Sequence, residues 1–322
     1  MRRILIAALT VSWLVFGAAG QAKAENIFIV AGTRFDIGQT LFGFDRATPG
    51  TLTSQRLITG LRPNEVVVGL DYRPATGQLY AFVSGPTVFD NSLYRIDAAT
   101  GAATFLFNLA GDYPDGGVDF NPVEDRLRSV DRNVLNDGVS NRRLNVDTGE
   151  VITDGNLSYA PGDVNAGRIL VVGGLGYTNS FAGATSTTLY GIDLANSSLF
   201  IQNPENAGTL NTVGPLGMSV ASFGAFDISG STGTAYAALG VSGGRTQFFT
   251  INLNTGAATA VGDFVIPGIQ PGAIGINAMT VAPAVLAPIP EPATLLLLGT
   301  GLAGVGTAVR KRRYARRRSE GV

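Results

Sequence analysis

Four polar residues fall at one place in a repeated sequence segment and are the strongest candidates for chemistry. Each stands two residues after the glycine or alanine that opens its copy of the segment: Asp71, Asp119, Asp227 and Asn277. Gly176 takes this place in the remaining copy. Convergent carboxylates can bind calcium or serve as acid and base on a sugar. The alternative is that each side chain hydrogen-bonds the backbone of its own structural unit.

The chain contains neither cysteine nor histidine. This excludes disulfides, thiolate chemistry, a Ser-His-Asp triad, and zinc, copper or haem sites that use these ligands. Asp, Glu, Arg, Tyr, Ser and Thr remain for chemistry, and only a hard ion with oxygen ligands, chiefly calcium, stays open. We therefore expect no cofactor except at most calcium, and we assign no catalytic residue.

Two other polar stretches are weaker candidates. Residues 112–117 (DYPDGG) are rich in oxygen ligands, but their spacing does not match the EF-hand loop. Residues 131–168 carry Arg142 and Arg143, which could clamp carboxylates or sulfates of an acidic polymer. The same arginines could instead pair with neighbouring acids on a solvated face.

The N-terminal residues 1–24 have the pattern of a secretory signal peptide. Arg2 and Arg3 precede an apolar run from Ile4 to Phe16, and Ala22-Lys23-Ala24 is a small-x-small cleavage site. The apolar run is shorter than the ~20 residues that a spanning helix needs, so a membrane anchor is the less favoured reading.

The C-terminal end has three parts in a fixed order. Pro290, Glu291 and Pro292 end a proline-rich linker at 283–292, and residues 293–309 form an uncharged run that can just span a bilayer. Residues 310–322 follow as a cytoplasmic tail, since its basic residues favour the inner side: Arg310, Lys311, Arg312, Arg313, Arg316, Arg317 and Arg318. A plain C-terminal anchor would have the same appearance apart from the Pro-Glu-Pro motif.

This three-part order closely resembles the PEP-CTERM sorting signal of Gram-negative bacteria. The resemblance implies that an exosortase cuts next to Pro290-Glu291-Pro292 and removes the helix. It also implies partners in the export machinery and an exported protein that is first anchored by its C-terminus. The final place would be the cell surface or the extracellular space.

The elements that must position the four polar residues are repeated strand pairs. One unit is GLDYRPATGQLYAF (69–82) and the next is SLYRIDAATGAATFLFNL (92–109). Each alternates apolar and polar residues and then breaks at turn formers, which is typical of hairpins. Relatives of the first unit open at 117, 174, 225 and 275, so the period is about 50 residues. This period matches four-stranded propeller blades.

The two chain ends complement each other in this pattern. A strand at 275–281 lacks partners, and three strands near 27–31, 40–44 and 52–58 lack an inner strand. Joining them closes a ring without exposed sheet edges. We predict an all-β propeller of five blades over residues 25–282; six blades or a β-sandwich are the alternatives.

The body also resembles an uncharacterised family of secreted bacterial proteins, a domain of unknown function. The resemblance runs from about Asn26 to Phe264 and includes LYRIDAATGAAT, GVDFNPVEDRLRSV, APGDVNAG and INLNTGAATAVG. It implies no activity and no catalytic residue.

The charge of the body limits its partners. Residues 25–292 hold 13 basic residues, all arginine, against 23 acidic residues, a net charge of −10. A nucleic-acid binder would need a basic face. We favour a non-catalytic surface or matrix module that binds polysaccharide, or a purely structural one. The alternative is a secreted glycan hydrolase or lyase that uses Asp with Tyr or Arg.

Overall fold

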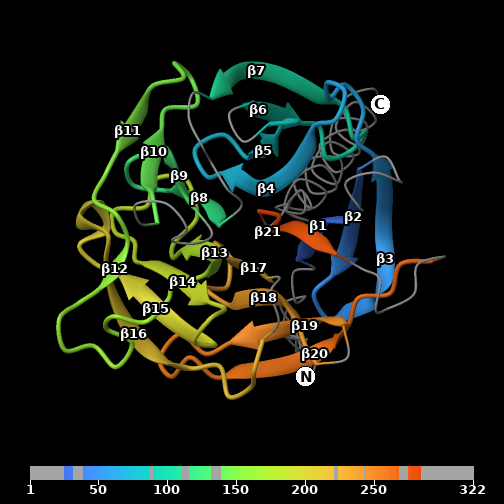
Figure 1. Ribbon diagram of the computed structural model, residues 1–322. Coiled ribbons are helices and arrows are strands. Elements are labelled where there is room, and N and C mark those ends of the chain that lie inside the picture. Colours follow the sequence, from blue (N-terminus) through green and yellow to red (C-terminus); the bar gives the residue numbers. More distant parts are fainter. Residues whose placement is uncertain are drawn as a thin grey trace, which may run out of the picture. The chain divides into compact units, whose positions relative to one another are not determined.

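The chain folds into five β-sheets arranged as blades around one axis (Figure 1). The computed structural model describes residues 25–31, 39–87, 90–109, 116–131, 139–220, 224–242, 244–267 and 275–283. The predicted signal peptide, the Pro-Glu-Pro motif, the tail helix and the basic tail lie outside these ranges. Within them, no helix is long and apolar enough to cross a membrane.

Each blade has four antiparallel strands, named here from the axis outward. Blade 1 is β4 (Val66–Arg73), β5 (Gln78–Ser84), β6 (Asn91–Ile96) and β7 (Ala103–Leu109). Blade 2 is β8 (Gly117–Asn121), β9 (Arg126–Val130), β10 (Asn141–Leu144) and β11 (Val151–Thr153). Blade 3 is β13 (Val172–Tyr177), β14 (Leu189–Asp193), β15 (Ser198–Gln202) and β16 (Thr209–Pro215), with the 3-10 helix η1 (Glu205–Ala207) between the last two. Blade 4 is β17 (Gly224–Ile228), β18 (Ala235–Gly240), β19 (Thr246–Ile251) and β20 (Ala258–Asp263). Blade 5 is β21 (Ile276–Val281), β1 (Asn26–Ala31), β2 (Thr40–Asp45) and β3 (Thr48–Leu57).

The turn residues explain why the strands end where they do. Asp97 follows β6, and its carboxylate accepts the amide of Ala99 at 2.8 Å. Asn252 follows β19 and accepts the amide of Asn254 at 2.9 Å. Such Asx turns are the expected use of Asp and Asn at the end of a strand. Gly101 completes the first of these turns at φ +82°, a conformation that a side chain would strain.

The hydrophobic core is divided among the contacts between neighbouring blades. Phe44 of blade 5 packs edge-on against Phe264, which follows β20, at 5.1 Å between ring centroids. Tyr80 of blade 1 packs against Phe120 of blade 2 at 5.3 Å. In the described chain, each of the five apolar clusters lies between two adjacent blades. Every blade therefore needs both neighbours to bury its two faces.

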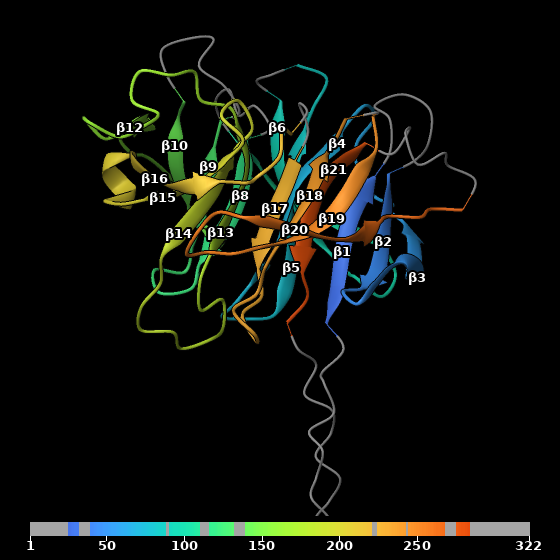
Figure 2. The same ribbon diagram turned by 90° about the horizontal axis from the view of Figure 1, so that it is seen from below.

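Blade 5 is built from both ends of the chain, as predicted. β1 pairs antiparallel with β21 from Ile27↔Val281 to Ala31↔Ile276, and the two lie side by side in Figure 2. The amide of Ala282 donates to the carbonyl of Asn26 at 2.9 Å. The predicted all-β class, blade number and closure are therefore confirmed.

Blade 3 departs from the predicted repeat. The segment LYGIDLANSSLFI (189–201) resembles the 92–109 unit, which forms the third and fourth strands of blade 1. It forms β14 and β15 instead, the second and third strands, because the segment after β13 turns without adding a strand. Thr209–Pro215 supplies the fourth strand as β16, and the short β12 (Ser158–Tyr159) pairs with it in parallel. The similar sequence thus forms a similar hairpin, but one strand closer to the axis than in blade 1.

Closure by β21 gives the first prediction. A chain from Glu25 to Pro283 should unfold cooperatively, whereas a chain from Glu25 to Gly275 should not, because loss of β21 exposes the apolar faces of β1, β4 and β17. Thermal unfolding followed by near-ultraviolet circular dichroism measures this. If both truncated chains gave the same cooperative transition, the closure by both ends would be disproved.

Candidate functional site: the carboxylates on the propeller axis

Three of the predicted residues meet on the axis. Asp71, Asp119 and Asp227 lie on the inner strands β4, β8 and β17, and one carboxylate oxygen from each is within 4.8 Å of the other two. Their exposed fractions are 4%, 2% and 5%. The side chains therefore converge as the sequence predicted, but in the buried wall and not on an open surface.

Each carboxylate joins its blade to the next one. Asp71 accepts the amide of Phe120 at 2.7 Å, and Asp119 accepts the amide of Tyr177 at 3.0 Å. Asp227 accepts the amide of Val281 at 2.6 Å. In all three cases the donor follows the matching position of the neighbouring inner strand. The sequence left open that each side chain hydrogen-bonds the backbone of its own unit. Only the second bonds of Asp71 and Asp227 are of this kind, and they go to the amides of Tyr72 and Ile228.

The two remaining positions of the ring are not acidic. A side chain at Gly176 would meet Ile228 at 2.9 Å, so the site has no room for a carboxylate. In blade 5 the place is held by Thr280, whose hydroxyl lies 3.2 Å from Asp71 Oδ1 and 3.1 Å from Asp227 Oδ2. Thr280 is thus a member of the cluster that the sequence pattern missed.

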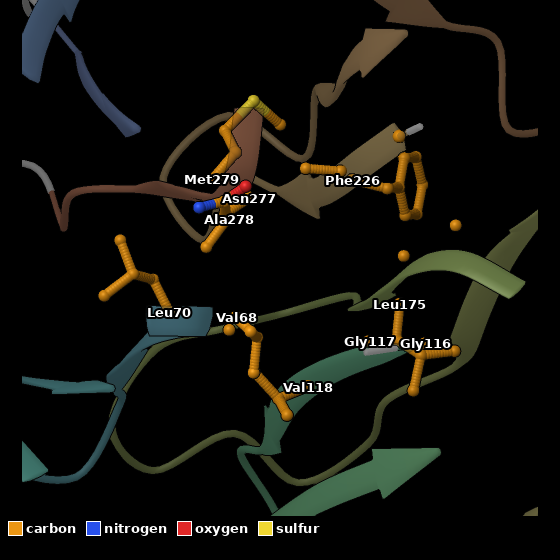
Figure 3. A pocket seen from close by; sticks show the side chains of 15 residues that line it. Val68, Leu70, Gly116, Gly117, Val118, Leu175, Phe226, Asn277, Ala278 and Met279 are labelled. Carbon is orange, nitrogen blue, oxygen red and sulfur yellow. The ribbon is translucent and has the colours of Figure 1, made fainter. Parts of the chain in front are cut away.

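Asn277 does not hold the place that the sequence alignment gave it. The alignment matched Gly275 with Gly69, whereas the structure matches Ala278 with Gly69, a shift of three residues along β21. Asn277 therefore lines the narrow opening above the carboxylates together with its neighbours on β21, as Figure 3 shows. Matching the two small residues, Gly69 and Ala278, would have revealed Thr280.

This opening is too small for a substrate. Its cavity volume is about 30 Å³, and its lining combines glycines with apolar side chains such as Leu70, Phe226 and Met279 (Figure 3). Ligand pockets usually measure several hundred Å³. A side chain at Gly174 would stand 2.6 Å from the amide nitrogen of Phe226, so the inner strands are already in contact. Among the described residues, the three carboxylates face no space that admits a sugar.

Burial raises the pKa of all three acids. The charge of Asp227 adds to burial in raising the pKa of Asp71 well above its ordinary value. For Asp119, burial and the charges of Asp71 and Asp227 have the same effect on the pKa. Burial raises the pKa of Asp227 to about 7. One oxygen of each carboxyl lies within 4.8 Å of the other two, and this closeness of buried acids favours the protonated form of the cluster.

The cluster is also the candidate metal set within the described ranges. Three carboxylate oxygens and the Thr280 hydroxyl are available, whereas calcium takes six to eight oxygen ligands. The carboxylates already accept backbone amides, which fits a cluster neutralised by protons better than one filled by calcium. Calcium binding stays a prediction to be tested.

The other predicted residues lie apart from the cluster. Residues 112–115 of the oxygen-rich loop fall outside the described ranges. Arg142 pairs with Asp131 at 3.0 Å, and Arg143 pairs with Asp154 at 2.7 Å. Both arginines of the predicted clamp thus have acidic partners from the protein itself.

Arg128 is a polar residue that the repeat pattern did not single out. It is fully buried and donates to the hydroxyl of Tyr177 at 2.7 Å and to Asn206 Oδ1 at 2.7 Å. Its strand β9 pairs Arg128 with Asp119, so the arginine supports the blade 2–blade 3 contact beside the cluster. The signal in the sequence that could have indicated Arg128 is a charged residue between the apolar residues of a predicted strand.

Comparison with known proteins identifies two segments. The model of a domain of unknown function, DUF4394, matches residues 40–271. The PEP-CTERM protein-sorting motif matches residues 288–313. This motif implies export, membrane-anchored sorting and processing by exosortase. No curated protein matches the sequence.

Solved structures show only distant likeness. TolB from Acinetobacter baumannii has 13% identity and a TM-score of 0.46, covering 80% of this chain and 67% of that one. A chain of a nidogen/laminin complex has 12% identity and a TM-score of 0.46, with 81% and 99% covered. A gluconolactonase from Xanthomonas campestris has 14% identity and a TM-score of 0.42, with 76% and 78% covered. Structural likeness at this level of identity and TM-score supports no conclusion about what this chain binds or acts on.

The raised pKa values give a prediction with a definite sign. The folded protein holds protons on this cluster more tightly than the unfolded chain does. Unfolding therefore releases protons, and the free energy of unfolding falls as pH rises. The stability due to Asp227 is complete below about pH 4, its ordinary range, and is lost as pH rises through about 7. The free energy of unfolding should therefore fall by roughly 1 to 4 kcal/mol between pH 5 and pH 8.

Asp119→Asn is the matched variant for this test. Its amide oxygen can still accept the Tyr177 amide, but the charge is gone, so the decline between pH 5 and pH 8 should become shallower. Urea unfolding at both pH values gives the numbers. An unchanged slope in the variant would contradict the assignment, and a rise in melting temperature on adding millimolar calcium at pH 8 would show a cation site instead.

Proposed function

The chain belongs to the DUF4394 family, and we propose that it is a non-catalytic binding or structural module of the cell surface or extracellular matrix. The single observation that supports this most is the use of the axial carboxylates. Asp71, Asp119 and Asp227 are the acids that the sequence offered for catalysis, and their oxygens accept amides across blade contacts.

A glycan hydrolase would need a different arrangement. Two carboxyl groups must flank the scissile bond, with the sugar and in some cases a water between them. Here three buried carboxyls lie within 4.8 Å of one another, below an opening of about 30 Å³. This geometry supports a structural role for the acids and argues against acid–base catalysis on a bound sugar.

The points where the chain enters and leaves the propeller fit a tethered module. Glu25 and Pro283 are neighbours, since β1 starts beside the end of β21. The carboxylate of Glu25 is buried in a polar socket, where it accepts the hydroxyl of Ser229 at 2.5 Å and lies 3.6 Å from Arg46. We propose that the sorting tail carries a closed, rigid domain to the surface and that the domain folds without the tail.

A polysaccharide panel tests this function. The full chain, extracted in detergent, is incubated with plant and bacterial polysaccharides, and reducing ends and unsaturated sugars are measured alongside binding. We expect no product above the level of a heat-denatured sample. Product release that Asp119→Asn abolishes would contradict the proposal and establish the hydrolase or lyase alternative.

A further inference from the structure

Blade 1 has a cavity at each end of its four strands. One has a volume of about 480 Å³ and lies where β4 and β6 begin and β5 and β7 end. The other, about 450 Å³, lies at the opposite end of the same strands. Both have the size of a ligand pocket, whereas the opening on the axis does not. They differ in the face on which they open and in their chemistry.

The faces are distinguished by the chain ends. Thr280 bonds Asp71, so the end of β21 lies level with the end of β4, where Tyr72 lines the smaller cavity. We call this end of the blades the exit face, because the chain leaves it at Pro283. A tether that follows Pro283 is attached to the exit face. The larger cavity opens on the opposite face, where β4 and β6 begin.

We propose that the larger cavity, called here the blade 1 cavity, is a binding subsite for a neutral sugar unit of an extracellular polysaccharide. The inference rests on the proposed function and names its ligand class. The residues that carry it are Arg62, Pro63, Glu65, Pro86, Asp90 and Asn108.

The floor of the blade 1 cavity is a neutralised ion pair. The Glu65 side chain is only 2% exposed and accepts hydrogen bonds from Arg62 Nη2 at 2.5 Å and from the Tyr94 hydroxyl at 2.5 Å. Burial would raise the pKa of Glu65, but the bonds from Arg62 and Tyr94 outweigh it and lower the pKa. Glu65 is therefore a fixed carboxylate with its charge balanced, which suits binding and not proton transfer.

The rim offers the groups that recognise sugar hydroxyls. Asp90 and Asn108 are exposed, and each has a planar group that can bond two neighbouring hydroxyls. Thr87 donates to Asp90 Oδ2 at 2.8 Å, and Arg62 donates to Asn108 Oδ1 at 2.9 Å, so both rim groups are held in place. Pro63 and Pro86 add flat apolar walls for the C–H face of a sugar ring.

The charge balance favours a neutral sugar over an acidic one. The only cation lining the blade 1 cavity in the described structure, Arg62, is paired with Glu65, and Asp90 adds a negative charge. The body as a whole carries −10. A uronate or sulfate would meet repulsion without a free guanidinium to offset it.

Calorimetric titration of the full chain in detergent tests the subsite. The probes are malto-, cello-, laminari- and mannohexaose, with hexagalacturonate as the acidic probe. At least one neutral hexasaccharide should bind, and hexagalacturonate should not. Asn108→Ala and Asp90→Ala should each weaken binding about tenfold, the effect of one or two lost hydrogen bonds. Gln78→Ala is the matched control, because this amide lines the exit-face cavity.

Several outcomes would overturn the subsite. They are the absence of binding by any neutral hexasaccharide, tighter binding of hexagalacturonate, or a loss of binding in Gln78→Ala with none in Asn108→Ala. These results leave the non-catalytic function standing, whereas release of shortened sugars in the same samples would contradict that function. Melting temperatures of the three variants, expected to match the wild type, exclude loss of fold as the cause.

Discussion

Five inner strands run side by side along one axis. Their backbone amides need hydrogen-bond acceptors that do not occupy the space on the axis itself. The chain solves this with carboxylates that reach sideways to the next blade: Asp71 to Phe120, Asp119 to Tyr177 and Asp227 to Val281. Small residues just above them let the strands approach, and at Gly174 a side chain would collide with the backbone of blade 4. The ring depends on both features, since each blade buries its apolar faces only against its neighbours.

This arrangement determines where function can lie. Burial and mutual closeness raise the pKa of the three acids, so the cluster retains protons more tightly than free carboxyls do, and its oxygens accept backbone amides. A closed axis leaves the two faces of the blades as the places for recognition. The exit face carries Glu25 and Pro283, and the opposite face carries the blade 1 cavity with Asp90 and Asn108 at its rim.

The sequence predicted the ring better than its details. The strand period, the closure by β1 and β21 and the meeting of Asp71, Asp119 and Asp227 followed from repeated glycines and alternating residues. The role of Thr280 did not, because a three-residue shift in β21 is invisible when only glycine is taken as the marker. The strand positions in blade 3 differ from the repeat for a related reason. A hairpin sequence pattern indicates which strands pair locally, but it does not give their distance from the axis. Most of the blade 1 cavity is lined by the connections before β4 and β6, where a single sequence has no pattern, and only Asn108 and Leu109 come from a repeated unit.

The central claim is that axial carboxylates hold neighbouring inner strands together through backbone amides. Native-state hydrogen exchange, resolved by residue, tests it most directly at Phe120, Tyr177 and Val281. We predict that these three amides exchange as slowly as those of the central strands, through global unfolding. Exchange at the rate of exposed turn amides that have no hydrogen-bond acceptor would contradict the account.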